Sequence, residues 1–497
     1  MADIPQSYPK VLSYNLRRLQ GSFSKNQVKV IPDNQSATPN SITRFRIVGN
    51  GLYDLRTVAL HIPKATASQT NTGANDPRIH FPRYSSSLIE NITITANNAA
   101  ICSYQGYNYL YNMINDLEAS DFSQLAKRNT AGENFDPTLA VSSANDATNC
   151  ALTVANRCLL ATGSTTSLPL CINNWLFFNS LSTPIVDLST IGDLFITITW
   201  ANSSVLWHSG NANTITAAQT ISNPTYTLSD MFMTVSRCQF SDPLYYTMLT
   251  EKLLGDGLSI GYHDWFYTSF STVANRTNGV SLSWSVNSQS LDRILVSFKH
   301  SQANNVRPLI MYGANHSTVA EAKTWAQVLA DPVGSANQSA SAIAGYNIAN
   351  LGDTFANSVF FLRNASSITG SKFNINSIDI DAWNLTALEI FQKYLQHDGM
   401  SHLDAAGGYV NPACYSLEHF KKYFFVDSCS LDLIAPNDNY YWVSGLNGQG
   451  TSLVIQYNAN FETTGNTTSV QPVAYCRSTN ILRIKAGRQL QVNPPIM

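Results

Sequence analysis

The sequence contains few charged residues. Of 497 residues, Lys plus Arg account for 30 and Asp plus Glu for 32, so charged residues make up 12% of the chain, against about 25% in an average globular protein. The net charge of −2 gives no dense basic surface that could displace phosphate counterions, which argues against a general nucleic-acid binder. Asn, Ser, Thr and Gln replace the missing charges. A neutral polar surface can be buried against copies of itself without stranding charges, which favours self-assembly.

Signals for secretion, membrane insertion and metal binding are also lacking. The first residues, MADIPQSYPK, contain no apolar signal-peptide core, and no run reaches the ~18 apolar residues needed to cross a bilayer. The cysteines contain no CxxC pair, which predicts neither a zinc site nor a disulfide framework. We therefore expect a soluble chain without cofactors, made in a reducing compartment, with buried free thiols at Cys102, Cys150, Cys158, Cys171, Cys238, Cys414, Cys429 and Cys476.

Strand patterns dominate the chain. Apolar residues alternate with others at period two in 43–47 and 58–62, as expected for strands with one buried face. Long polar stretches at about 129–167 and 202–223 exceed the ~12 to 15 residues of ordinary connections, which marks them as functional loops. Similar strand patterns occur at 92–94, 194–200, 231–235, 282–286, 294–298, 373–380, 453–457 and 481–484.

Helix patterns are few. Apolar residues of 107–117 fall at helical spacing and predict one amphipathic helix that lies on a sheet or at a barrel end. A capping-box spacing at Thr318 and Glu321 predicts a short helix that ends before Pro332. Asn384 is a suitable N-cap for a third helix over 385–396.

These elements occur twice in the same order. In each half a strand, a short gap, a helix and a long excursion precede an aromatic strand, predicted at 175–178 and 423–426, and two further strands. Because a single core rarely grows past roughly 250 to 300 residues, this order predicts two copies of one β domain that meet near 241–243. Sparse helices and long crossovers favour jelly rolls over up-and-down barrels. The predicted fold class is therefore all-β, with two consecutive eight-stranded jelly rolls.

Several segments resemble the double jelly-roll major capsid proteins of tailless icosahedral viruses, most closely those of polinton-like viruses and virophages. The strand 88–97 with its following helix resembles the first barrel, and 281–298, with Ser290-Leu291-Asp292 at its centre, resembles the opening of the second. Further similar segments are 186–200, 226–235 and 363 to the helix at 385. The resemblance covers most of the chain and consists of packing patterns rather than a chemical signature.

The resemblance implies a homotrimer with a pseudo-hexameric outline that tiles an icosahedral shell. It implies an N-terminal arm over 1–25, a first jelly roll over 26–242 and a second over 243–497, with 129–167 and 302–353 as outer or trimer-locking loops. Neighbouring capsomers and penton and minor or cement proteins are the implied partners, and the implied location is the virion capsid after synthesis in the host cytoplasm. Whether a membrane lies under the shell is left open.

The N-terminal arm is only weakly basic. Arg17 and Arg18 are its candidate inward-facing contacts, and they stand among scattered lysines rather than in a dense basic run. We expect the arm to contact an inner protein or an adjacent capsomer, and no direct nucleic-acid binding.

Three chemical motifs compete with a purely structural function. Ser259 lies in a GxSxG sequence, but the helix that a nucleophile elbow requires is not predicted after it, so a β-rich hydrolase is disfavoured. His397, Asp398, His402 and Asp404 could hold a divalent ion, although a solvated helix end explains them as well. The aromatic runs 265–267 and 440–442 would suit an all-β carbohydrate- or receptor-binding protein, such as a fibre or adhesin, if they were exposed.

Overall fold

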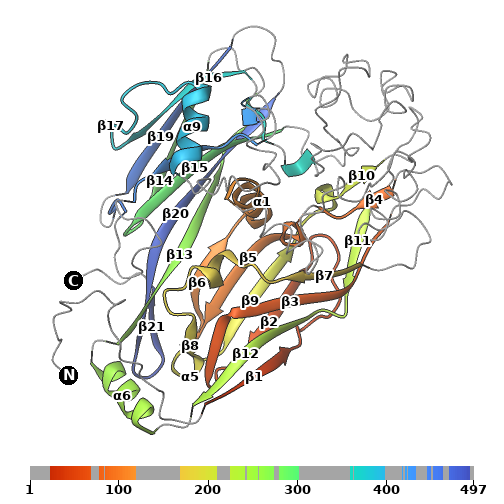
Figure 1. The fold of residues 1–497 in the computed structure, drawn as a ribbon, viewed down its shortest axis with the longest axis vertical. Helices are drawn as coiled ribbons and strands as arrows, with labels where there is room; N and C mark the ends of the chain where they lie inside the picture. Colours follow the sequence, from red (N-terminus) through yellow and green to blue (C-terminus); the bar gives the residue numbers. More distant parts are fainter. Residues whose placement is uncertain are drawn as a thin grey trace, which may run out of the picture.

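The structure is a computed structural model of the whole chain. It describes residues 23–68, 78–82, 84–118, 168–209, 224–240, 243–255, 257–273, 279–300, 359–361, 363–365, 367–397, 417, 420–421, 424–432, 445–448, 452–462 and 469–492. Their strands form four large antiparallel sheets, two from each half of the sequence, and one small two-stranded sheet (Figure 1).

The first half folds into two facing sheets. One has the order β1-β12-β3-β11, with β7 and β8 also paired to β3, and the other has the order β2-β9-β5-β6. A two-stranded sheet of β4 and β10 lies beside them. The strands are β1 (Phe23–Val30), β2 (Ile42–Ile47), β3 (Leu52–Ser68), β4 (Arg78–His80), β5 (Ile89–Ala96), β6 (Ala99–Tyr104), β7 (Leu168–Ile172), β8 (Ile185–Asp187), β9 (Leu194–Trp200), β10 (Trp207–Ser209), β11 (Thr225–Ser229) and β12 (Phe232–Phe240).

The second half folds into another pair of sheets. Their orders are β13-β20-β15-β18, with β21 also paired to β20, and β14-β19-β16-β17. The strands are β13 (Leu258–Ser269), β14 (Val280–Val286), β15 (Leu291–His300), β16 (Ile368–Ile375), β17 (Ile378–Asp379), β18 (Asp427–Ser430), β19 (Leu453–Phe461), β20 (Val470–Lys485) and β21 (Gln489–Val492).

The two halves share one strand order. β2, β9, β5 and β6 of the first half occupy the places of β14, β19, β16 and β17 of the second, and β1, β12, β3 and β7 those of β13, β20, β15 and β18. In both halves the first strand pairs with the last long strand, β1 with β12 and β13 with β20. The second strand pairs within the facing sheet, β2 with β9 and β14 with β19, which is the topology of a jelly roll. The predicted all-β fold with two consecutive jelly rolls is confirmed.

Alternating burial explains why these segments form strands. β2 and β9 alternate exposed or half-buried residues with buried ones along their whole length, and β14 and β19 do the same in the second half. Their inward residues meet those of the facing sheet in one continuous apolar core. Cys102, Cys238, Cys429 and Cys476 are buried free thiols, as predicted, whereas the free thiol of Cys171 is half-buried.

Helices occupy the ends of the sheets and the connection between the halves. The helices predicted over 107–117 and 385–396 are confirmed as α1 and α9, and the helix expected at 318–329 lies outside the described residues. The α-helices are α1 (Tyr107–Glu118), α4 (Leu176–Asn179), α5 (Leu188–Ile191), α6 (Pro243–Leu254) and α9 (Ala387–His397), and the 3₁₀ turns are η2 (Ser85–Leu88), η4 (Ser203–Val205) and η7 (Val359–Phe361). Within this described part, no helix is long and apolar enough to cross a membrane.

Three local predictions are corrected. Residues 175–178 are not a strand: they enter the short helix α4, where Trp175 is buried and donates its indole N–H to the Val58 carbonyl at 3.0 Å. The second aromatic segment precedes strand β18, which begins at Asp427 instead of at 423. The N-terminal cap of α9 is Thr386 rather than Asn384, because Thr386 and Glu389 form a reciprocal capping box.

Candidate functional site: the junction between the jelly rolls

The two jelly rolls meet where β6 of the first lies against β13 of the second. The Tyr104 hydroxyl donates to the His263 carbonyl at 2.6 Å, and in return the Tyr262 hydroxyl donates to the Ile101 carbonyl at 2.8 Å. Both tyrosines are buried. Each jelly roll therefore donates a hydrogen bond from a buried tyrosine hydroxyl to a backbone carbonyl of the other. These hydrogen bonds fix the orientation of a contact that is otherwise apolar.

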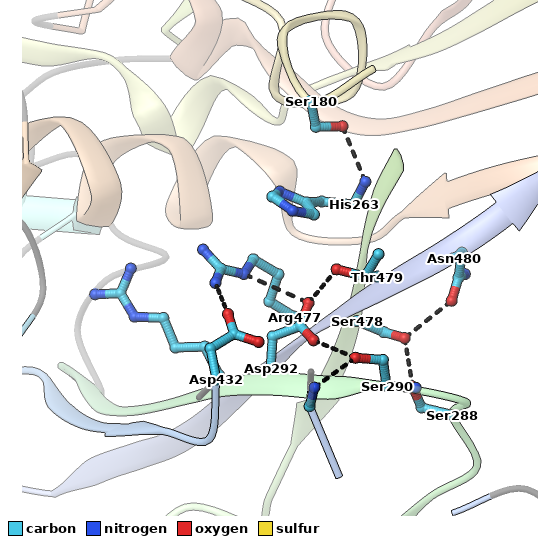
Figure 2. Close-up of polar contacts among 12 residues, drawn as sticks. Ser180, His263, Ser288, Ser290, Asp292, Asp432, Arg477, Ser478, Thr479 and Asn480 are labelled. Atoms are coloured by element: carbon cyan, nitrogen blue, oxygen red, sulfur yellow. Dashed lines mark hydrogen bonds and ion pairs between the residues drawn. The ribbon is translucent and has the colours of Figure 1, made fainter. Parts of the chain in front are cut away.

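A segment that follows α4 covers the free edge of β13. Ser182 accepts the Gly261 amide through its hydroxyl and donates its own amide to the Gly261 carbonyl, both at 2.8 Å. Ser180 accepts the His263 amide at 3.0 Å (Figure 2). An edge strand exposes unpaired backbone groups, and here those groups are paired by the other jelly roll.

Helix α1 lies between the two sets of sheets (Figure 1). The Tyr475 hydroxyl of β20 donates to the Gly106 carbonyl at 2.9 Å, just before the helix begins. Gly106 has φ +59°, and a Cβ there would lie 2.7 Å from that hydroxyl, so the close approach requires glycine. From Tyr107 to Met113 every side chain of α1 is buried. The helix contacts β5 and η2 of the first half and η7 of the second.

Burial at the junction shifts two neighbouring titratable groups in opposite directions. Desolvation lowers the pKa of His263 to about 3, and the nearby Arg477 charge adds to this effect. Desolvation raises the pKa of Asp264 to about 6, partly offset by the Trp265 amide that its carboxylate accepts. Near neutral pH the imidazole is therefore uncharged, and the carboxyl group keeps a charge only at a desolvation cost.

A buried polar cluster lies close to the junction, in the second jelly roll (Figure 2). Asp292 accepts hydrogen bonds from Ser290 and Thr479, each at 2.6 Å, and lies 3.9 Å from the Arg477 guanidinium. Arg477 makes its closer ion pair with Asp432, at 2.9 Å. The same cluster continues through hydrogen bonds among Ser288, Ser478 and Asn480.

Two carboxylates share one guanidinium in this cluster. Burial raises the pKa of Asp292, and the Asp432 charge raises it further, while Ser290, Thr479 and Arg477 lower it. Both oxygens of Asp292 already accept hydrogen bonds from the protein. The described residues contain no group of three or more His, Cys, Asp or Glu side chains that could hold a metal ion. The hydrogen bonds of Ser290 to Ser288 and Asp292 therefore hold the turn between β14 and β15.

The loop that contains Gly445 closes over this cluster. The Gly445 amide donates to the Ser290 hydroxyl at 3.0 Å, and Leu446 exchanges backbone hydrogen bonds with Leu291. A Cβ on Gly445 would lie 2.5 Å from both the Asp292 carboxylate and the Leu291 carbonyl, so only glycine fits there.

The structure supports none of the chemical motifs predicted from the sequence that fall within the described residues. Ser259 lies within the twelve-residue strand β13, opposite Arg483, and no helix follows it, so the strand-turn-helix geometry of a nucleophile elbow is missing. Trp265 is only 5% exposed, which removes it as a sugar-stacking platform. The remaining candidates lie outside the described residues: Arg17, Arg18, Asp398, His402, Asp404, the run 440–442 and the side chain of His397.

Sequence reasoning missed most of the residues that build the junction. Tyr104, Tyr262 and Tyr475 look like ordinary strand tyrosines, and their acceptors are backbone carbonyls far away in the chain. Only the Ser290-Leu291-Asp292 motif was singled out, and it proves to be the centre of the buried cluster.

No protein-family model matches the chain, and no characterised protein matches it in sequence. Its fold, however, is similar to solved viral capsid structures. One is a crystal structure of PBCV-1 VP54 fitted into a reconstruction of the virophage Sputnik, with 12% identity, a TM-score of 0.57 and coverage of 97% of this chain and 99% of that one. Another is the Faustovirus major capsid protein, with 11% identity, a TM-score of 0.55 and coverage of 97% and 93%. A PBCV-1 capsid model gives 12% identity, a TM-score of 0.55 and coverage of 97% and 99%. The chain thus has the double jelly-roll fold of these proteins along nearly its whole length.

Proposed function

We propose that the chain is a viral major capsid protein that works without catalysis. The observation that carries the proposal is the tandem jelly roll, which matches solved capsid structures over 97% of this chain in both PBCV-1 and Faustovirus comparisons. The low charge density supports it, because large surfaces between identical chains are then desolvated at lower cost.

The working form is a homotrimer with a pseudo-hexameric outline, in the capsid of a virion assembled after synthesis in the host cytoplasm. A fused pair of similar domains lets a threefold assembly present six similar edges to its neighbours. We place the arm at 1–25 and the jelly rolls at 26–242 and 243–497, with the division at the start of α6. Penton and minor capsid proteins are further proposed partners, and the arm, with Arg17 and Arg18, contacts protein rather than nucleic acid.

Electron microscopy of the purified chain tests this function. We expect hexagonal capsomers with a threefold top and, at high concentration, flat sheets or closed particles. A stable 54.5 kDa monomer at micromolar concentration, with no particles, would contradict the proposal.

A carbohydrate- or receptor-binding protein is the alternative class. It requires a shallow groove of exposed aromatic side chains. In the described run 265–267, Trp265 is buried and Tyr267 packs on Tyr475 with ring centroids 5.0 Å apart, which favours an internal role for these aromatics. Binding on a glycan array, without assembly, would instead support the alternative.

A further inference from the structure

The connection between β2 and β3 contains a chemically reactive pair, Asn50-Gly51. In an Asn-Gly pair the glycine backbone nitrogen can attack the asparagine side-chain carbonyl carbon, because glycine has no Cβ to hinder the approach. The attack closes a succinimide ring and expels ammonia, and water then opens the ring to aspartate or isoaspartate. In a folded chain the rate depends on what holds the glycine amide and on what stabilises the charges that develop. The sequence contains three such pairs, at 50–51, 278–279 and 447–448, and Asn278 lies outside the described residues.

The two fully described pairs differ in the state of the glycine amide. The Gly448 amide donates to the Ser288 carbonyl at 2.8 Å, and Gly448 is buried. The Gly51 amide makes no hydrogen bond with any described residue, Gly51 is half-buried and Asn50 is exposed. The attacking nitrogen is therefore engaged at 447–448 and available at 50–51.

The side-chain carbonyl of Asn50 already accepts a hydrogen bond from a buried donor. The Tyr53 hydroxyl donates to Asn50 Oδ1 at 2.6 Å, and Tyr53 is 2% exposed. Burial raises the pKa of Tyr53, although the Arg237 charge lowers it in part, so the phenol keeps its proton near neutral pH. Attack on the amide carbon places negative charge on this same oxygen, and a donor already in position stabilises such an oxyanion.

Arg237 stabilises the attacking group. Its Nη2 donates to the Asn50 backbone carbonyl at 2.7 Å, and this carbonyl belongs to the same peptide group as the Gly51 nitrogen. When that nitrogen loses its proton, the negative charge is shared with the carbonyl oxygen, where the guanidinium already lies. The guanidinium also lies close to Gly51, because a Cβ there would be 3.3 Å from Arg237 Nε.

The remaining contacts hold the turn without engaging the reacting atoms. The Leu188 amide of α5 donates to the Gly51 carbonyl at 2.9 Å, and the Asn50 amide donates to the Val48 carbonyl at 2.9 Å. The turn is thus fixed beside α5, near the lower end of the first jelly roll in Figure 1. Neither hydrogen bond uses the Gly51 nitrogen or the Asn50 side chain.

We propose that Asn50 is a site of spontaneous deamidation, in which the Gly51 nitrogen attacks the Asn50 side-chain carbonyl carbon while Tyr53 and Arg237 stabilise the charges that form. Hydroxide takes the Gly51 proton, and a carbon–nitrogen bond forms to Gly51 as the bond to the side-chain nitrogen breaks. That nitrogen takes up a proton and leaves as ammonia. One water molecule then opens the ring at either carbonyl, with no change in oxidation state. The reaction needs no partner, so its outcome does not depend on the capsid function.

The product differs from the parent chain in charge and in main-chain length. Each conversion adds one negative charge beside Arg237, in a chain whose net charge is −2. Isoaspartate also adds one carbon to the main chain between β2 and β3, next to the Gly51 carbonyl that Leu188 binds. Because the change is irreversible, the converted fraction records the age of the chain.

Peptide mapping by mass spectrometry, after incubation of the folded chain in mildly alkaline heavy-oxygen water, measures conversion at each pair. Only rings that open during the incubation take up the heavy oxygen, so earlier conversion is not counted. We expect Asn50 to convert about fivefold faster than Asn447 or more, the factor for one net hydrogen bond at Gly448, and to give both aspartate and isoaspartate. In concentrated urea the two rates should become equal. Equal rates in the folded chain, a ratio that persists in urea, aspartate alone or chain cleavage after Asn50 would each overturn the proposal.

Two variants test the stabilising residues. Tyr53→Phe removes the hydroxyl and Arg237→Met removes the guanidinium, and each should slow conversion of Asn50 roughly tenfold. The rate at Asn447 is the internal control for folding, because unfolding frees the Gly448 amide and accelerates that site. A variant that keeps the parent rate at both asparagines overturns the role assigned to the residue it replaces. Asn50→Gln, which would have to close a larger ring, should abolish conversion at this position, and persistent conversion there would refute the assignment to Asn50.

Discussion

The two jelly rolls share a topology but fill their interiors differently. The first buries mostly apolar and aromatic side chains, with Asp54 and Asp187 as its buried charged residues among those described. The second encloses Asp292, Arg293, Arg363 and Asp427. One strand order therefore accommodates two kinds of interior. The second kind depends on specific partners, because a buried charge that loses its partner is far more costly than a lost apolar contact of similar size.

The ion pairs of Arg477, which is half-buried, with the buried Asp292 and the half-buried Asp432 give the largest expected difference. Arg477→Leu leaves Asp292 and Asp432 without their guanidinium, and we expect it to lower the free energy of unfolding by about 3 to 5 kcal/mol at pH 7.5. Urea denaturation measures the loss. The matched control is Arg46→Leu in the first jelly roll, whose pair with Asp193 is exposed and should be worth at most about 1 kcal/mol. Equal losses would show that the two interiors do not differ in this way.

The pH dependence of stability should also show the effect of the charged residues buried in the second jelly roll. Burial raises the pKa of Asp427 to about 6, so the folded chain binds this proton more tightly than the unfolded chain, whose Asp has its usual pKa near 3.8. The parent therefore gains stability from this group as pH falls from about 6 towards 4, by up to about 1.4 kcal/mol per pH unit. Asp427→Asn should lose this gain, so its stability falls relative to the parent over that range in urea denaturation at several pH values.

An exposed acid provides the control for that experiment. The hydrogen bond from Lys372 lowers the pKa of Asp379, so its contribution is present at neutral pH and is lost on acidification. Asp379→Asn should therefore change the slope in the opposite direction. If both variants shift the slope in the same direction, burial does not control the titration of Asp427.

A close approach of the backbone gives a smaller effect. Gly445→Ala places a Cβ 2.5 Å from the Asp292 carboxylate and the Leu291 carbonyl, and we expect a loss of about 1 to 3 kcal/mol from overpacking. Thermal unfolding monitored by circular dichroism would show a lower midpoint. Gly255→Ala, where the nearest contact is an ordinary 3.5 Å, should leave the midpoint unchanged or raise it slightly.

The smallest effect concerns the two equivalent helices. Thr386→Ala removes the capping box of α9 and should cost about 1 kcal/mol in urea denaturation, because α9 lacks the packing on all sides that holds α1. Thr250→Ala in α6 is the control, since Thr250 only donates back to the Tyr246 carbonyl within the helix. A loss at Thr250 as large as that at Thr386 would contradict the assigned capping role.

The sequence predicted the larger elements better than their contacts. Alternating segments such as 194–200 and 453–457 became β9 and β19 because one face of each strand is buried along its whole length. The short aromatic run at 175–178 failed because periodicity cannot distinguish a brief apolar strand from one helical turn. Pro243 is typical of a first helical position, yet only the boundary between the two domains was predicted near 241–243, and α6 was missed.

The junction was not predictable from local patterns. Its hydrogen bonds join tyrosine hydroxyls to backbone carbonyls more than a hundred and fifty residues away, as in Tyr104 with His263, where |i−j| is 159. No alternation or motif specifies which carbonyl a tyrosine will meet. Only the docking of two completed sheets brings these atoms together.

The pairing of first and last strands determines the order in which a nascent chain acquires its structure. β1 pairs with β12, so the first jelly roll cannot close until residue 240 has been synthesised. β13 pairs with β20, so the second cannot close until Lys485, the end of β20, has been synthesised. Contacts this distant in sequence make folding slow. During synthesis the first jelly roll therefore folds before the second, and the second folds against its surface. Release of the chain before Val470 leaves that successor without its closing strand and exposes an unpaired β-edge, the kind of species that chaperones bind and that aggregates readily.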